Sequence, residues 1–245
     1  MYKTMMQQNY AAYQAEDQAV WQLLFQRQWD NLKDKAVGEL WPALEAAKTA
    51  LNGQEIPNFN QLSPLLQKEQ NFSIEVVPGL IPVEEFFALL AQRRFPSSTW
   101  LRKMEELDYL EEPDMFHDTF GHIPLLFNAQ YADFMQEFGR IGLQLAHLPE
   151  AVAALERLYW FTIEFGVCQN AQGQEIYGAG ILSSFGESIQ VHQGNNCEFR
   201  PFQLETVLQH HFYKHEMQSV YYCLDNFQSL FGLLKEVEQR LLSLA

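Results

Sequence analysis

The segment 150–166 is apolar on nearly every side when it is read as a helix, so other elements should pack around it. One acidic residue, Glu164, lies inside this apolar segment. A buried carboxylate is unstable unless a hydrogen bond, an opposite charge or a metal ion compensates it. The sequence therefore predicts a buried helix with a metal ion or a buried arginine, such as Arg140 or Arg157, beside Glu164.

Two histidines, His117 and His122, lie five residues apart in the stretch 112–126. Pro113 and Asp114 favour the start of a short helix there, because proline suits the first helical turn and acids are stabilised at the positive end of the helix dipole. Five residues of a regular helix turn the chain through about 500°. Both imidazoles can therefore face one point only if the helix ends between them.

Gly121 and Pro124 predict such an ending. His117, His122 and Glu164 could then hold one metal ion, since imidazole is the commonest metal ligand. Two histidines and one carboxylate are typical of non-haem iron(II) oxygenases, but the same set of ligands also binds catalytic zinc. The alternative is that the two histidines are hydrogen-bonded core residues.

Arg102 precedes the histidine stretch and is a candidate for substrate binding. Its planar guanidinium could bind a carboxylate through two parallel hydrogen bonds. The alternative is an ion pair with a nearby acid, which would be Glu105, Glu106 or Glu111.

Apolar periodicity predicts helices over residues 15–51, 82–94, 130–147 and 227–244. Pro42 should divide the first of these into two helices. Short strands are predicted over residues 72–77 and 220–224, and a surface connection with one short helix should run up to Leu66. The predicted fold class is mainly α, with packed helices and a few short β-strands in a single domain over residues 1–245.

The charge of the chain argues against two classes of partner. The sequence has 16 Lys and Arg against 31 Asp and Glu, a formal charge of −15, which repels nucleic acids and anionic membrane surfaces. No stretch reaches the roughly 18 apolar residues of a membrane span, and the polar start lacks the apolar part of a secretory signal. We therefore expect a cytoplasmic protein that binds neither nucleic acid nor membrane.

The sequence contains Glu-Pro-Asp-x-x-His-x-x-x-Gly-His-x-Pro-Leu, Tyr-Trp-Phe-Thr-Ile-Glu-Phe-Gly-Val and Tyr-Gly-Ala-Gly-Ile-Leu-Ser-Ser-Phe-Gly-Glu. These long stretches, in this order, resemble the pterin-dependent aromatic amino acid hydroxylases, and in particular the compact bacterial phenylalanine 4-hydroxylases. The resemblance extends back to residues 16–21 and so covers nearly the whole chain. It implies a mainly helical catalytic domain that converts L-phenylalanine to L-tyrosine with O2 and a tetrahydropterin at iron(II).

The resemblance also implies roles for individual residues. The iron ligands would be His117, His122 and Glu164. The amino acid would contact Arg102, Pro113, Asp114, Trp160, Gly180 and Ser183, with Arg102 holding the substrate carboxylate and Asp114 orienting Arg102. The pterin would contact Leu80, Ile81, Phe86, Asp118 and Tyr159, where Asp118 replaces the longer glutamate of many members. No catalytic residue beyond the metal site is implied.

Three other functions are compatible with the same residues. A tryptophan hydroxylase of this family would use the same centre, a zinc hydrolase could use the same three ligands, and a non-catalytic protein could bind a partner in an aromatic pocket. Residues 1–245 leave no room for the separate regulatory domain or the tetramerisation segment of animal members. We therefore expect a monomer whose partners are a small aromatic amino acid and a pterin.

Overall fold

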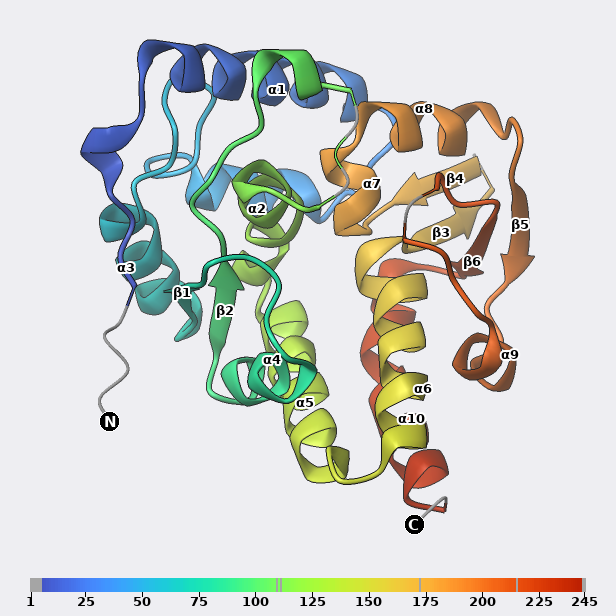
Figure 1. The fold of residues 1–245 in the computed structure, drawn as a ribbon. Coiled ribbons are helices and arrows are strands. Elements are labelled where there is room, and N and C mark those ends of the chain that lie inside the picture. Colours follow the sequence, from blue (N-terminus) through green and yellow to red (C-terminus); the bar gives the residue numbers. More distant parts are fainter. Residues whose placement is uncertain (1–5, 109, 111, 172, 215, 244–245) are drawn as a thin grey trace.

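The structure is a computed structural model that describes residues 6–108, 110, 112–171, 173–214 and 216–243. These residues form a mainly helical fold with short strands, which confirms the predicted fold class (Figure 1). The α-helices are α1 (Ala15–Leu32), α2 (Leu40–Ala47), α3 (Phe59–Gln70), α4 (Val83–Ala91), α5 (Ala129–Leu145), α6 (Pro149–Tyr159), α7 (Ala179–Ser183), α8 (Phe185–Gln193), α9 (Leu204–Gln209) and α10 (Leu233–Leu242). Within the described ranges, no helix combines the length and the apolar character that a membrane crossing requires.

The chain also contains short 3-10 turns, which are tighter than an α-helix, and π-helical turns, which are wider. The 3-10 turns are Tyr10–Ala12, Met104–Glu106, Pro124–Phe127 and Phe227–Gly232. The π-helical turns are His117–His122 and Trp160–Glu164. The second π-turn continues α6 directly, and both π-turns carry residues that the sequence singled out.

The strands form two small sheets. They are β1 (Ser73–Val76), β2 (Arg94–Ser97), β3 (Val167–Asn170), β4 (Gly173–Ile176), β5 (Glu198–Pro201) and β6 (Val220–Leu224). β1 and β2 pair in parallel, and the other sheet has the order β4-β3-β6-β5. In that second sheet β3 and β4 are antiparallel, whereas β6 is parallel to both β3 and β5.

The buried apolar side chains form one continuous cluster to which the helices and both sheets contribute. In the predicted buried helix, five apolar side chains are at most 2% exposed, namely Ala151, Leu155, Leu158, Phe161 and Ile163. The side that carries Tyr159, Trp160 and Glu164 is only half-buried. The helix is therefore covered on most of its sides and remains accessible on the side of Glu164.

Several predicted boundaries are wrong. The first helical region breaks at residues 33–39, and Pro42 lies in the first turn of α2, where its missing N–H costs no hydrogen bond. The connection up to Leu66 contains most of α3, a full helix capped by the Asn58 side chain. The predicted helix over residues 82–94 ends at Ala91, because Arg93 takes a left-handed conformation with φ 55° and the chain then enters β2.

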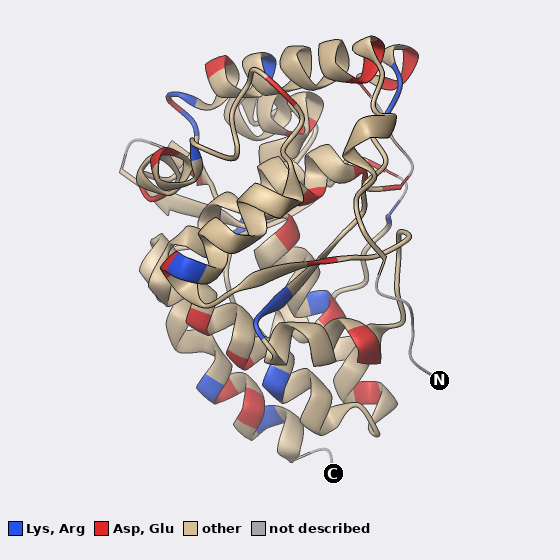
Figure 2. Cartoon of the chain, turned by 90° about the vertical axis from the view of Figure 1, so that its left-hand side faces the viewer, with Lys and Arg blue, Asp and Glu red and all other residues tan. Residues whose placement is uncertain are grey.

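The strands predicted over residues 72–77 and 220–224 are confirmed as β1 and β6. Further elements were not predicted, which are β2, β3, β4, β5, α7 and α9. On the side of the molecule drawn in Figure 2, Lys and Arg segments lie singly among Asp and Glu segments. This distribution matches the excess of acidic residues in the sequence.

A prediction concerns the close crossing of α4 and α5. A Cβ atom added at Gly139 would lie 2.4 Å from the backbone nitrogen of Ala91, so an alanine there should force the two helices apart. We expect Gly139→Ala to lower the free energy of unfolding by about 2 kcal/mol, as measured by urea denaturation. The control Gly232→Ala has open space around its Cβ and should not destabilise. Equal losses in both variants would contradict the packing argument.

Candidate metal centre and active site

The helix that carries the two histidines runs through both of them, contrary to the predicted ending. It begins at Met115 and widens into the π-turn His117–His122, in which the Ile123 N–H donates to the Asp118 carbonyl at 3.3 Å. A π-helix joins residue i to residue i+5 by a hydrogen bond. Residues five apart therefore lie one above the other, and both imidazoles face the same side without a helix end between them.

The segment that carries Glu164 has the same geometry. The Phe165 N–H donates to the Trp160 carbonyl at 2.9 Å, which closes the second π-turn. This turn brings the Glu164 carboxylate to the two imidazoles. Among the described residues, these three side chains form the one group with metal-ligand chemistry whose candidate atoms all lie within 4.8 Å of one another.

The distances between these atoms fit a single metal ion. The two Nε2 atoms of His117 and His122 are 3.0 Å apart, and they lie 3.5 Å and 3.2 Å from the nearest Glu164 oxygens. Two atoms that each bind an ion at about 2.1 Å, at right angles to one another, are about 3.0 Å apart. The three side chains therefore fit one face of a metal centre.

The protonation states also suit a metal. Burial by itself would raise the pKa of Glu164, but the neighbouring His122 and His117 outweigh burial and lower this pKa to about 2. Burial lowers the pKa of His117 to about 4. At neutral pH the carboxylate is therefore ionised and the His117 imidazole neutral, which are the forms that bind metals.

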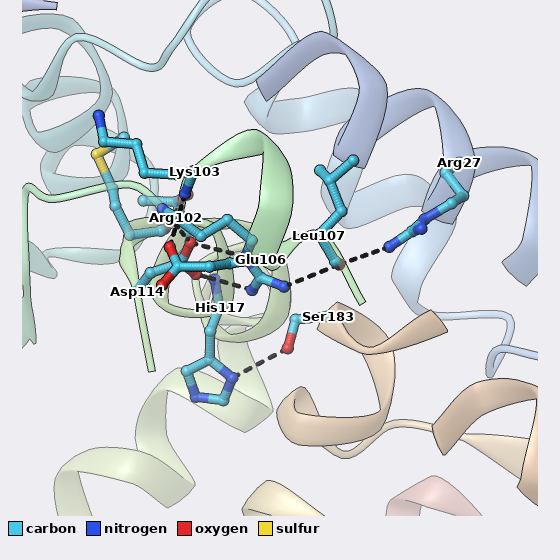
Figure 3. Close-up of polar contacts among 10 residues, drawn as sticks. Arg27, Arg102, Lys103, Glu106, Leu107, Asp114, His117 and Ser183 are labelled. Carbon is cyan, nitrogen blue, oxygen red and sulfur yellow. Dashed lines mark hydrogen bonds and ion pairs between the residues drawn. The ribbon is translucent and has the colours of Figure 1, made fainter. Parts of the chain in front are cut away.

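Ser183 fixes the tautomer of His117. The Ser183 hydroxyl donates its only hydrogen to the Ala179 carbonyl at 2.8 Å, so it can only accept from the His117 Nδ1, which lies 2.9 Å away (Figure 3). The proton of the neutral imidazole is then on Nδ1. This arrangement leaves the lone pair of His117 Nε2 facing Glu164 and His122.

Arg102 and Asp114 form a buried ion pair next to the metal ligands (Figure 3). The Asp114 carboxylate accepts from Arg102 Nε at 2.9 Å, from Nη2 at 3.0 Å and from the backbone N–H at 3.0 Å. It also accepts from the backbone N–H of His117 at 3.1 Å. The alternative pairing with Glu105 or Glu106 is absent, and Glu111 lies outside the described residues. One N–H of Nη1 points to the Leu107 carbonyl at 3.4 Å, and its second N–H is left for a ligand carboxylate.

Sequence reasoning missed Arg27, which supports the loop after Arg102. The Nη2 atom of Arg27 donates to the Leu107 carbonyl at 2.8 Å, and the same carbonyl lies 3.4 Å from Arg102 Nη1 (Figure 3). The Arg27 guanidinium also lies over the Phe185 ring at 4.9 Å. Arg27 is one polar residue on the amphipathic α1, so its sequence context carries no signal of this role.

An aromatic wall adjoins His122. The Tyr159 ring lies parallel to the His122 imidazole at 6.3 Å and edge-on to Phe86 at 5.3 Å. Leu80, in the loop before α4, is 73% exposed, and Ile81 is half-buried. Four of the predicted pterin residues are therefore placed near His122 or before α4: Phe86 and Tyr159 pack on each other from α4 and α6, and Leu80 and Ile81 lie in the loop that precedes α4.

Asp118 points toward the end of β2. Its carboxylate accepts from the Ser98 backbone N–H at 2.7 Å and lies 3.3 Å from the Ser97 hydroxyl. Burial raises the pKa of Asp118 to about 7. The side chain thus ties the histidine turn to the strand that follows α4.

Small residues let α7 contact both ligand-bearing turns. A Cβ atom at Gly121 would lie 2.7 Å from the Ala179 carbonyl oxygen, and one at Gly178 would lie 2.5 Å from the Glu164 carbonyl oxygen. At Gly180 the nearest atom would be the tip of the Phe165 ring, at 3.0 Å. The absence of a side chain at these glycines allows the backbones of α7 and of the two π-turns to approach closely.

The alternative partners for Glu164 are excluded by the contacts of the two arginines. Arg140 binds Glu137 and Glu238, and Arg157 donates to the Leu208 carbonyl. Of the other predicted pocket residues, Pro113 is exposed just before Asp114, and Trp160 lies at the start of the second π-turn.

Two histidines and one glutamate at one point, beside a buried arginine–aspartate pair, define a mononuclear metal centre of the kind that non-haem iron oxygenases use. The sequence model of the family of biopterin-dependent aromatic amino acid hydroxylases matches residues 1–242. The chain belongs to this family.

Relatives of known name support this membership. The chain is 42% identical to a phenylalanine-4-hydroxylase of Chromobacterium violaceum over 219 residues. These residues make up 89% of this chain and 73% of that protein. The chain is 32% identical over 218 residues to a phenylalanine-4-hydroxylase of Bos taurus, covering 88% of this chain and 48% of that protein. The identity therefore extends to bacterial and animal members.

Solved structures have the same fold. The C. violaceum phenylalanine hydroxylase with bound iron(III) and 7,8-dihydrobiopterin superposes with a TM-score of 0.89 at 39% identity, over 98% of this chain and 86% of that one. The apo phenylalanine hydroxylase of Colwellia psychrerythraea 34H superposes with a TM-score of 0.86 at 34% identity, over 98% of this chain and 95% of that one.

A prediction follows from the hydrogen bond between Ser183 and His117. We expect Ser183→Ala to weaken iron(II) binding about tenfold, because the His117 tautomer and ring orientation lose their support. Competition with a coloured chelator measures the affinity. The control Ser243→Ala removes an exposed hydroxyl on the last turn and should bind iron like the wild type. Unchanged affinity in Ser183→Ala would argue against the role of this hydroxyl.

Proposed function

We propose that this protein is a phenylalanine 4-monooxygenase, which converts L-phenylalanine to L-tyrosine with O2 and a tetrahydropterin at one iron(II). The observation that carries the proposal is the cluster of His117, His122 and Glu164 beside the Arg102–Asp114 pair, in a chain of this family. The names of its relatives and the iron and dihydrobiopterin bound by the C. violaceum structure support the same reaction.

His117, His122 and Glu164 would hold the iron through the two Nε2 atoms and the carboxylate. When bound, iron(II) and the pterin supply the activation of O2 and the transfer of one oxygen atom to the aromatic ring. The three residues lie on one side of the centre, so they leave coordination positions open on the other side. Ser183 would keep the His117 lone pair directed at the metal.

The amino acid would bind through its carboxylate to Arg102. Asp114 binds the Nε and Nη2 groups of that guanidinium and so fixes the side chain, and Nη1, which shares one N–H with the Leu107 carbonyl, would use its second N–H for the ligand. Pro113, Trp160, Gly180 and Ser183 would line the pocket for the aromatic ring. Gly180 suits this position because it has no side chain to compete with the substrate.

The pterin would lie along the aromatic wall. Phe86 would stack on the pterin ring, with Leu80 and Ile81 contributing from the loop before α4. Tyr159 would form the side of this site nearest His122. Asp118 would contact the pterin through its remaining oxygen, since Ser98 and Ser97 approach only Oδ2.

We also propose that residues 1–245 form one catalytic domain without a regulatory or tetramerisation domain among them, and that the protein is a monomer. One continuous hydrophobic cluster supports the single domain. Sedimentation at micromolar concentration tests the oligomeric state.

The acidic chain and the small-molecule site are consistent with a cytoplasmic enzyme.

The experiment that tests the reaction supplies iron(II), O2, a tetrahydropterin and equal amounts of phenylalanine and tryptophan, and identifies the products by chromatography. We expect tyrosine, and only when pterin and O2 are both present. 5-Hydroxytryptophan as the main product would keep the chemistry and change the substrate. Neither product from folded, iron-loaded protein would contradict the proposal and favour a zinc-type hydrolase.

A prediction concerns Glu164. We expect Glu164→Ala to lower the iron content to a small fraction of one ion per chain and to abolish tyrosine formation, because two neutral imidazoles alone hold iron(II) weakly. Elemental analysis and product chromatography measure the two effects. The control Glu156→Ala removes an exposed acid from the same helix and should keep both iron and activity. Full activity in Glu164→Ala would exclude Glu164 as a ligand.

A second prediction concerns Arg102. We expect Arg102→Lys to raise the KM for phenylalanine about tenfold or more, because an ammonium group cannot bind Asp114 and a carboxylate through parallel hydrogen bonds. The iron content should not change, since Arg102 contributes no candidate metal ligand. Steady-state kinetics measure this KM. Arg240→Lys, on the surface of α10, is the matched control. A wild-type KM in Arg102→Lys would contradict the role of the guanidinium.

A further inference from the structure

Gln218 connects the second π-turn to residues 210–214 and 216–217, called the segment below, which lie between α9 and β6. Its side chain is nearly buried, and all of its polar groups are engaged. The Oε1 atom accepts from the Trp160 indole N–H at 2.8 Å. The Nε2 atom donates to the carbonyls of Tyr213 at 3.3 Å and Glu216 at 3.2 Å. One amide thus holds the indole ring and two points of the segment.

A buried carboxylate holds Gln218 itself. The Gln218 backbone N–H donates to Glu187 at 3.0 Å, and the Tyr221 hydroxyl donates to the other Glu187 oxygen. Gln190 of α8 donates to the Gln218 carbonyl at 2.7 Å and to the Tyr221 hydroxyl at 3.1 Å. Burial raises the pKa of Glu187. This network fixes the backbone at Gln218 relative to α8, and its members are not in the predicted set of site residues.

The network holds the indole ring of Trp160, which lies on the same π-turn as the candidate ligand Glu164. Trp160 opens the π-turn that ends at Glu164, so the two side chains are only four residues apart on this turn. The indole lies flat on Phe212 at 4.4 Å, with an angle of 15° between the rings, and it also contacts Phe165 at 4.6 Å. Phe165 in turn packs against Gly180.

The described part of the segment also contacts Phe161 of the second π-turn, whose ring lies 5.2 Å from the His210 ring and 6.3 Å from the Phe212 ring. An open cavity of about 440 Å³ lies between Ala153 and Glu156 of α6 and residues 211–214 of the segment. A buried hydrogen bond from a fixed amide is therefore a strong constraint on both the segment and the Trp160 ring.

We propose that Gln218 is a positioning residue for the aromatic ring of the amino acid, which acts through Trp160. By holding the indole N–H, it fixes the plane of the Trp160 ring, and Glu187 fixes Gln218. The inference rests on the proposed function, because it gives Trp160 the role of a wall of the amino acid pocket. Loss of this hydrogen bond leaves the indole free to turn, so the substrate ring is held less firmly over the metal.

The test is a double-mutant cycle on the iron-loaded enzyme with Gln218→Met and Trp160→Phe. Methionine has a similar volume but replaces the amide oxygen by a thioether, which accepts only weakly, and phenylalanine keeps a ring but lacks the N–H. We expect Gln218→Met to raise the KM for phenylalanine about fivefold and to lower the tyrosine formed per pterin oxidised. In the Trp160→Phe background, adding Gln218→Met should change the KM less than about twofold.

Three controls make the outcome specific. Gln228→Met breaks a surface hydrogen bond to Glu39 and should behave like the wild type. Iron content should be equal in all variants, which separates positioning from loss of the metal. The NMR signal of the Trp160 indole N–H can be assigned because it is missing in Trp160→Phe. Its rate of hydrogen exchange with solvent should increase in Gln218→Met. If Gln218→Met does not fold, Gln218→Asn withdraws the amide by one methylene and carries the same expectations.

An equal rise in KM in both backgrounds would overturn the proposal, because Gln218 would then act without Trp160. Faster indole exchange with an unchanged KM would overturn it too. If the wild type forms no hydroxylated amino acid, the proposed function fails. Calorimetry can then measure the dissociation constant of phenylalanine for the same variants. These constants still decide whether Gln218 acts through Trp160.

Discussion

The buried carboxylate of Asp114 is the interaction on which the site depends. It is fully buried and accepts four N–H groups, three from Arg102 and one from the backbone of His117. A carboxylate without these partners would be too costly to bury. Asp114 therefore binds both Arg102, the proposed substrate-binding residue, and the first turn of the helix that carries the histidines, and so fixes these two parts relative to each other.

The two π-turns convert linear spacings into one metal centre. His117 and His122 are five residues apart, which matches the i to i+5 hydrogen bonding of a π-helix. Glu164 lies at the end of the other π-turn, and α7 packs on both turns through glycines at its contact points. Ser183 of α7 then orients His117. The ligands are thus held by backbone packing and by residues that do not touch the metal.

Short stretches of sequence were enough to predict the candidate ligands and the helical character of the fold. Glu164 was a candidate because an acid in an apolar helix needs a partner. His117 and His122 were candidates because they are only five residues apart. The error was the assumption of regular helix geometry, which required an end at Gly121. Arg27, Glu187 and Gln218 could not be predicted, because the contacts that give them their roles, to Leu107, between Glu187 and Gln218, and to Trp160, join residues 31 or more positions apart in the chain.

The sequence by itself determined the residue types available for chemistry, the apolar helices and the identity of the candidate ligands, because burial cost and periodicity are local properties of the chain. Only the tertiary structure decided how these residues meet. The meeting of the two π-turns, the close approach of α7 and the network from Glu187 to Trp160 join segments that are distant in the chain. Hydrogen bonds of this kind form only after the core has brought their donors and acceptors together, so no local pattern encodes them.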